Sequence, residues 1–113
     1  MSGRGTDAEN IAAAFLQQQG LALVARNYRC RFGEIDLIAR DGDTLVFVEV
    51  RMRSSERFGG AAGSITAAKK QKLLRTARHY LAATAGTPAC RFDALLLQGG
   101  DPSIEWLKNA FTE

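Results

Sequence analysis

Two apolar runs with a polar turn between them predict a β-hairpin near the middle of the chain. The stretch from Gly33 to Arg53 reads GEIDLIARDGDTLVFVEVRMR, and its apolar runs flank Asp41-Gly42. An Asp-Gly pair in this setting is a strong hairpin signal, because tight hairpin turns need residues that tolerate a positive φ. The sequence therefore predicts a two-stranded antiparallel unit around which the other elements are arranged.

The register of this hairpin places several charged side chains on one face. With Asp and Gly of the turn as the two loop residues, Asp36 faces Phe47 and Glu34 faces Glu49. Opposing residues point to the same side of a sheet, and side chains alternate along each strand. The charged residues predicted to share one face are Glu34, Asp36, Glu49 and Arg51. Asp36 and Glu49 become diagonal neighbours within reach of one ligand, whereas a loop of odd length would separate them.

Carboxylates in this hairpin call for a chemical explanation. Leu45–Val50 is apolar on both faces except for Glu49, which predicts a central strand covered on both sides. A carboxylate there is unfavourable unless it is paired, hydrogen-bonded or bound to a metal. Converging carboxylates are the usual protein ligands of Mg²⁺. A buried network, with Glu49 paired to Arg51 and Glu34 paired to another arginine, is the alternative, and the pattern leaves both open.

Helical periodicity before the hairpin predicts a first helix. Thr6-Asp7-Ala8-Glu9 fits a capping box with Thr6 as N-cap, and the helix extends to about Gln19, where Gly20 ends it. Residues 1–5 are expected to form a loose arm. The apolar stripe predicted to face the core is Ala8, Ile11, Ala12, Phe15 and Leu16. Glu9 has two open interpretations, since it can bond back to the cap or lie near the carboxylates.

A second helix is predicted from Thr66, as N-cap, to about Ala85. Its apolar stripe is Leu73, Leu74, Ala77, Tyr80 and Leu81, and its basic residues are Lys69, Lys70, Lys72, Arg75, Arg78 and His79. Such a basic helix is the best candidate for contacting phosphates, although an ordinary solvated face is the alternative. Lys69, near the helix start, can point back at the carboxylates. His79 is expected to be a surface group because no second histidine accompanies it.

The remaining segments complete an α/β order. Strands are predicted at Leu21–Tyr28, at Ala89–Gln98 and, as a short last strand, at Ser103–Lys108, with Ala110-Phe111 packing on the core. Asp93 is expected to pair with an arginine. A helix, a three-strand antiparallel meander, a helix and a crossover to further strands predict a three-layer α/β sandwich with a mixed sheet. We expect residues 1–113 to form a single domain.

Composition narrows the class of protein only slightly. The 113 residues are 46% hydrophobic and 24% charged, as in soluble globular proteins, and the formal net charge of +3 is compatible with a nucleic-acid partner. Cys30 and Cys90 lie far apart and suggest neither a zinc site nor a disulfide framework. An apolar run of membrane length and a signal peptide are both missing, so we expect a cytoplasmic protein without a membrane partner.

The carboxylate pattern also resembles a known family. Asp36, a spacer and Glu49-Val50-Arg51 are similar to the Asp–spacer–Glu-x-Lys signature of the PD-(D/E)XK nuclease superfamily. The whole chain closely resembles the YraN-type family of small, uncharacterised bacterial proteins, which is assigned to that restriction-endonuclease-like fold. The further segments that carry the resemblance are Asn27-Tyr28-Arg29, Phe58-Gly59-Gly60, Lys69, Tyr80-Leu81, Arg91-Phe92-Asp93 and Ala110-Phe111.

The resemblance implies a metal-dependent nuclease site. Asp36 and Glu49 would be ligands of Mg²⁺ or Mn²⁺, assisted by Glu34 or Glu9. Position 51 would carry the catalytic cation, but it is arginine here, which stays protonated and can only stabilise charge. Lys69 is a candidate for the missing lysine, as in nuclease branches where the catalytic lysine lies on a helix.

This interpretation requires a nucleic acid as partner, and the expected one is DNA with branched or single-stranded character. The residues predicted to contact its phosphates are Arg26, Arg29, Arg31, Lys70, Lys72 and Arg75. The glycine-rich segment Phe58–Ser64 is either a substrate-facing lid or a plain connector. A homodimer is compatible with this class. The alternatives to a Mg²⁺-dependent endonuclease are a non-catalytic nucleic-acid-binding adaptor and a protein interaction module with the same fold.

Overall fold

A computed structural model describes residues 3–53, 67–84, 86, 88–98 and 104–111 of the chain. The elements in chain order are α1 (Gly3–Gln18), β1 (Ala22–Cys30), β2 (Gly33–Asp41), β3 (Thr44–Arg53), α2 (Ala67–Ala82), β4 (Cys90–Gln98) and β5 (Ile104–Phe111). The strands form one sheet in the order β1-β2-β3-β4-β5. Only the β3–β4 pair is parallel; the other three pairs are antiparallel. The predicted meander, crossover and mixed sheet are thus confirmed.

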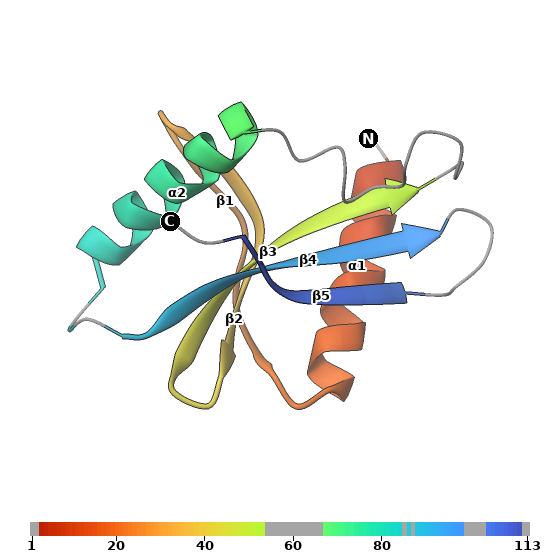
Figure 1. Cartoon of the computed structure of the whole chain (residues 1–113). Coiled ribbons are helices and arrows are strands. Elements are labelled where there is room, and N and C mark those ends of the chain that lie inside the picture. Colours follow the sequence, from red (N-terminus) through yellow and green to blue (C-terminus); the bar gives the residue numbers. More distant parts are fainter. Residues whose placement is uncertain (1–2, 54–66, 85, 87, 99–103, 112–113) are drawn as a thin grey trace.

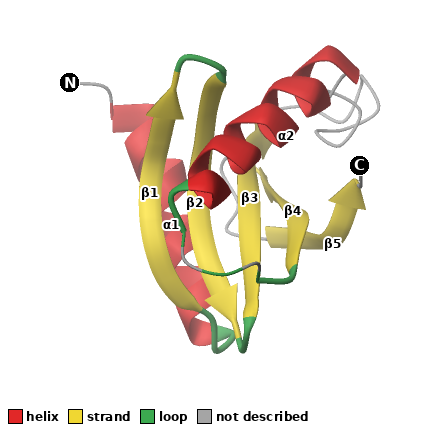
Figure 2. Cartoon of the chain, turned by 90° about the vertical axis from the view of Figure 1, so that its left-hand side faces the viewer, coloured by secondary structure: helices red, strands yellow, loops and turns green. Residues whose placement is uncertain are grey.

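The two helices cover opposite faces of the sheet (Figures 1 and 2). Under α1, Ala12 and Leu16 pack with Val46 and Val48 of β3 in one apolar cluster. A second cluster under α2 contains Phe47, which confirms that β3 is covered on both sides. Its other members are Ile35, Ile38, Leu45, Leu73, Leu74, Ala77 and Phe92. This arrangement is the predicted three-layer α/β sandwich.

The first helix differs from the prediction at its start and in its stripe. It begins at Gly3, so Thr6 is not its N-cap and residues 3–5 are helical rather than a loose arm. One capping interaction is worth only about 1 kcal/mol, which a continued helix with further backbone hydrogen bonds can offset. Ile11, placed in the core by its spacing, is 47% exposed, while Ala13 is buried in its place.

The end of α1 is a Schellman motif, as Gly20 suggested. Gly20 has a φ of +96° and its N–H donates to the Gln17 carbonyl, while the Leu21 N–H donates to the Leu16 carbonyl at 3.0 Å. Leu16 and Leu21 are both buried. The motif turns the chain sharply from the helix into β1.

The hairpin between β2 and β3 forms with a register shifted by two residues from the prediction. Asp41 pairs with Thr44, so the two loop residues are Gly42 and Asp43. Gly42 has a φ of +62° at the first loop position, as in a type II′ turn, which takes glycine first. Because the shift is an even number of residues, each side chain stays on the face of the sheet predicted for it, and the charged residues still share one face. Asp36 is no longer opposite Phe47, whose partner is Ile38.

Smaller expectations have mixed outcomes. The second helix ends at Ala82, slightly earlier than predicted, and the Thr84 hydroxyl donates to the Tyr80 carbonyl at 3.0 Å beyond it. The final strand reaches Phe111, and Ala110 is exposed, so its predicted packing on the core is wrong. Segment 58–64, the cap at 66 and the turn at 99–102 lie outside the described residues. Neither described helix is long and apolar enough to cross a membrane.

Candidate functional site

The sheet opens between β2 and β3 where the charged residues lie. The last β2–β3 partners on this side are Leu37 and Val48, yet β2 extends back to Gly33 and β3 on to Arg53. Beyond that point β2 stays paired with β1, and β3 stays paired with β4. Figure 1 shows β3 and β4 running to the right while β1 and β2 turn upwards. The diverging strand ends leave room for a site.

A pocket of about 450 Å³ occupies this opening. It collects residues from the start of α1, both diverging strands and the start of α2, segments that are far apart in the sequence. Its lining is Ala8, Glu9, Gly33, Glu34, Asp36, Glu49, Val50, Arg51, Met52, Lys69, Lys72 and Leu73. All six residues that the sequence proposed as metal ligands or catalytic cations therefore lie at one pocket.

Asp36 and Glu49 form a carboxyl pair within the pocket. Continuing the hairpin register brings the two residues directly opposite each other, and their carboxyl groups are hydrogen-bonded. The Asp36 Oδ2 also accepts the Val50 N–H at 2.9 Å, so a side chain replaces the strand ladder where the ladder ends. Glu49 is only 7% exposed. The pair is held by backbone elements on both sides.

Burial and like charge disfavour two ionised carboxylates here. Burial, and then the Glu49 carboxylate, raise the pKa of Asp36 to about 7, against the opposing effect of the Val50 N–H. Burial also raises the pKa of Glu49, while Arg51 acts in the other direction. Because burial raises both pKa values, the pair favours holding one proton between its two carboxyl groups.

Two cations contact the same oxygen of Glu49. Arg51 Nη2 lies 3.2 Å from Oε2, and Lys69 Nζ lies 3.4 Å from it. The sequence expectation that Lys69 points back from the helix start at the carboxylates agrees with this geometry. Arg51 Nε is buried and has no hydrogen-bond partner among the residues that the structure describes. The site thus presents a lysine and an arginine together, from α2 and β3.

Glu34 and Glu9 line the pocket without joining the carboxyl pair. Glu34 is exposed and pairs with Arg29 at 3.4 Å, while Glu9 reaches the pocket from α1. Among the residues that the structure describes, no group of three histidine, cysteine, aspartate or glutamate side chains is close enough to hold a metal ion. A metal at this site would therefore rest on Asp36 and Glu49.

The predicted phosphate-contacting residues lie on β1, on its turn into β2 and on α2. Arg26, Arg29 and Arg31 are exposed, and Arg26 donates to Asn10 at 2.6 Å. On α2, Lys72 and Arg75 are exposed and Lys70 is half-buried. Neither β1 nor α2 contains an acidic residue. Of the six predicted residues, Lys72 lines the pocket.

The sequence did not single out Gly33 as part of the site. Its φ is +149°, and a Cβ at this position would lie 3.1 Å from the Thr76 Oγ1 of α2. Thr76 is fully buried and its hydroxyl donates to the Lys72 carbonyl at 2.8 Å. Only glycine lets the start of β2 approach α2 this closely. The glycine that begins the GEIDLIA segment was the feature of the sequence from which this close approach could have been predicted.

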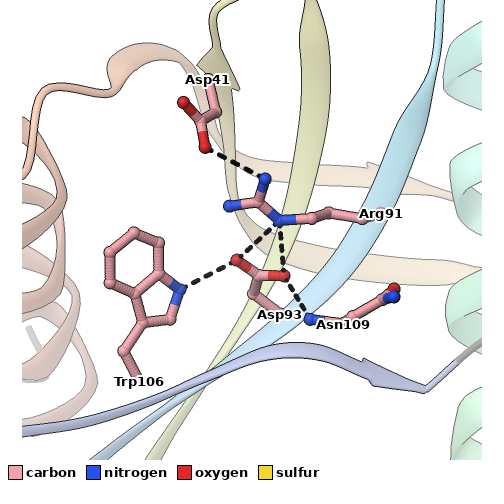
Figure 3. A network of polar contacts seen from close by, with 5 residues as sticks. All are labelled: Asp41, Arg91, Asp93, Trp106 and Asn109. Atoms are coloured by element: carbon pink, nitrogen blue, oxygen red, sulfur yellow. Dashed lines mark hydrogen bonds and ion pairs between the residues drawn. The ribbon is translucent and has the colours of Figure 1, made fainter.

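Asp93 belongs to a separate network, as its predicted pairing with an arginine suggested (Figure 3). It is fully buried and accepts hydrogen bonds from Arg91 Nε at 3.1 Å, from Trp106 Nε1 at 2.8 Å and from the Asn109 N–H at 2.9 Å. Arg91 also contacts Asp41 at 3.0 Å. The network ties β4 to β5 and to the hairpin, and it is structural.

Comparison with known proteins identifies the family. The sequence profile of the "Uncharacterised protein family UPF0102" matches residues 8–97. The chain belongs to this family. A UPF0102 protein of Nitrosomonas europaea is 68% identical over 111 residues, which cover 97% of this chain and 94% of that protein. A UPF0102 protein of Methylobacillus flagellatus is 58% identical over 113 residues, covering 99% of both chains.

A solved structure shares the fold of this UPF0102 protein. The Holliday junction resolvase Hjc of Archaeoglobus fulgidus superposes with a TM-score of 0.60 at 18% identity, over 98% of this chain and 80% of that chain. At this identity the likeness concerns the fold alone. It confirms the expected restriction-endonuclease-like fold.

Proposed function

We propose that this UPF0102 protein is a metal-dependent phosphodiesterase that hydrolyses DNA, with Asp36 and Glu49 as metal ligands. The observation that supports this most is the buried carboxyl pair at the point where β2 and β3 diverge. Burial and the Glu49 carboxylate raise the pKa of Asp36 to about 7, so ionising both carboxyl groups is unfavourable near neutral pH. A divalent cation bound in the pocket would stabilise the ionised forms of both carboxyl groups.

The donor chemistry of the pocket fits Mg²⁺ or Mn²⁺. Both ions prefer oxygen ligands, and Mg²⁺ is commonly bound through one or two carboxylates, its other positions being filled by water and substrate phosphate. Asp36 and Glu49 supply those carboxylates, and no described histidine or cysteine lines the pocket. A bound ion would supply a Lewis acid for the phosphoryl oxygens and a water of lowered pKa.

The side chains around the pair have distinct roles in this proposal. Lys69 lies 3.4 Å from Glu49 and lines the pocket, so its charge would stabilise the oxygens of a phosphate bound there. Arg51 stays protonated, so it can stabilise developing negative charge but cannot deprotonate a water. The Val50 N–H fixes the Asp36 carboxyl group in the pocket.

The substrate class rests on charge and on the fold neighbour. The basic residues of β1 and α2 suit a phosphate backbone, and each contact would release counterions and make binding salt-dependent. The fold neighbour from Archaeoglobus fulgidus is a Holliday junction resolvase. Branched DNA is therefore the first substrate to test, beside single-stranded and duplex DNA and RNA.

Metal binding is the experiment that tests the core of the proposal. Mn²⁺ and Mg²⁺ are titrated calorimetrically into the wild type, Asp36→Asn, Glu49→Gln and the control Asp43→Asn, an exposed carboxylate of the hairpin loop. Wild type and Asp43→Asn should bind metal, and the two pocket variants should not. Cleavage of a four-way junction should then require metal, Asp36 and Glu49. A wild type that binds neither metal at millimolar concentration would refute the proposal.

One observation favours a second function. Glu49 already pairs with two cations, so the network can be read as closed without a metal. In that case the protein is a non-catalytic nucleic-acid-binding adaptor. Asp36→Asn would then leave DNA affinity unchanged, and the wild type would show no cleavage with any metal. A salt-independent or absent affinity for nucleic acid would exclude the adaptor and leave a protein interaction module.

A further inference from the structure

Exposed aromatic side chains gather beside α2, outside the metal pocket. Phe32, in the turn between β1 and β2, lies with its ring centroid 6.0 Å from that of His79 in an edge-to-face arrangement. The Tyr28 hydroxyl is 2.6 Å from His79 Nδ1, and Arg31 lies over the Phe32 ring at 5.0 Å. His79 and Arg31 are exposed, and Phe32 and Tyr28 are partly exposed. The sequence analysis treated His79 only as a surface group.

This aromatic cluster is continuous with the pocket. Phe32 immediately precedes Gly33, which lines the pocket and packs against α2. On the helix, Lys72 lines the pocket and His79 follows two turns later on the same face, about 10 Å along the axis. A track thus leads from the carboxyl pair, past an exposed lysine, to the aromatic rings.

We propose that Phe32 and His79 form a stacking platform for an unpaired nucleobase of the DNA whose phosphodiester lies in the pocket. The inference rests on the proposed function and specifies its substrate: a DNA with a single-stranded or extrahelical nucleotide next to the scissile phosphate. Aromatic rings beside basic side chains are the recurrent means of binding unpaired bases, because every base has a π-face. A base-paired duplex offers no free face to such a platform.

Arg31 shows where the base would lie. Its guanidinium covers one face of Phe32 as a planar cation and is exposed to solvent, so its contact is weak and readily exchanged. A stacked base replaces this contact with a stronger one, and the displaced guanidinium becomes free to pair with a phosphate. The Tyr28 hydroxyl holds the His79 ring beside the turn.

The test measures binding without cleavage. Affinity and base stacking are followed in EDTA with two probes, a blunt DNA duplex and the same duplex carrying a single-stranded overhang with 2-aminopurine at its first unpaired position. The variants are Phe32→Leu, His79→Ala and His79→Phe, with Phe15→Leu as the matched control. Phe15 is a partly exposed phenylalanine that packs against Trp106, away from α2. Thermal unfolding of each variant checks that it is folded.

The expected results are specific to the unpaired base. Wild type should prefer the overhang probe and quench its fluorescence. Phe32→Leu and His79→Ala should lose about 10-fold in affinity for that probe, with no change on the blunt duplex. His79→Phe, which keeps the ring but not the bond to Tyr28, should retain the preference, and so should Phe15→Leu.

Two results would overturn the platform: a wild type with no preference for the overhang probe, or a preference that survives in both Phe32→Leu and His79→Ala. If Phe32→Leu does not fold, the exposed His79 variants decide alone. The proposed hydrolysis is judged separately by metal-dependent cleavage, so a failure of the platform can be distinguished from a failure of the proposed function.

Discussion

Replacing Asp36 by asparagine should stabilise the metal-free protein at neutral and alkaline pH. Asparagine keeps an oxygen to accept the Val50 N–H but cannot ionise beside Glu49. In the folded protein, burial and the neighbouring Glu49 carboxylate raise the pKa of Asp36 from 3.8 to about 7. The folded state therefore holds this proton more tightly than the unfolded chain does, and the wild type loses stability as the pH rises between these two values.

The size of this effect follows from the shift. A rise of about three pKa units corresponds to about 4 kcal/mol, at about 1.4 kcal/mol per unit. Because the Asp36 carboxyl group is partly open to the pocket, solvent screens part of that energy, and we expect about 2 to 4 kcal/mol. In a domain of this size such a difference raises Tm by roughly 5 to 15 °C.

Urea or thermal unfolding in EDTA measures this difference in stability. The experiment compares the wild type, Asp36→Asn and Asp43→Asn between about pH 4 and pH 8. The wild-type and Asp36→Asn curves should meet near pH 4 and separate with Asp36→Asn more stable near pH 8. Asp43→Asn should follow the wild type throughout, because Asp43 is an exposed loop carboxylate. If Asp36→Asn is less stable than wild type at pH 8, Asp36 is ionised and paired, and the reasoning about the carboxyl pair is wrong.

Three further outcomes are expected. Lys69→Met should lower the rate of metal-dependent cleavage by about 100-fold or more, because a cation near the phosphate stabilises the transition state. Calorimetry should show an unchanged metal affinity. An unchanged cleavage rate would exclude Lys69 from the reaction. Asp93→Asn should lower the free energy of unfolding by about 3 kcal/mol without altering metal binding, since it removes the buried one of the two carboxylates that pair with Arg91 and leaves only Asp41. A neutral effect in urea unfolding would contradict this. Gly33→Ala should lower the free energy of unfolding by about 3 kcal/mol, and Gly42→Ala by about 1 kcal/mol. Both glycines have a positive φ, but only at Gly33 would a Cβ crowd a neighbouring atom, the Thr76 Oγ1 of α2. Equal losses in urea unfolding would refute the close approach of Gly33 to α2.

The pocket between β2 and β3 illustrates how far local sequence reasoning extends. The alternation of side chains along β2 and β3 was sufficient to predict that Asp36, Glu49 and Arg51 lie together. A shift of the strand register by two residues leaves every side chain on the same face of the sheet. The predicted register of the hairpin was wrong. A type I′ turn takes glycine at its second loop position and a type II′ turn takes it at its first, so the same Asp-Gly-Asp sequence fits both turns. The direct opposition of Asp36 and Glu49, and with it the shared proton, follows only from the observed turn.

Other features depend on contacts between distant segments. The end of α1 was predictable because Gly20 acts through its own backbone, whereas Ile11 was misplaced because burial depends on which part of the sheet lies beneath each helical turn. The encounter of Phe32 with His79 joins positions that no local pattern connects.

The sequence by itself determined the elements, their order, the doubly covered strand β3 and the face that carries the acidic residues. These properties follow from side-chain periodicity and from backbone preferences that act within a few residues. Only the tertiary structure decided where β2 parts from β3, that Lys69 and Arg51 share one oxygen of Glu49, and that burial beside Glu49 raises the pKa of Asp36. Each of these depends on the distance and desolvation between charges from separate elements, which packing alone sets.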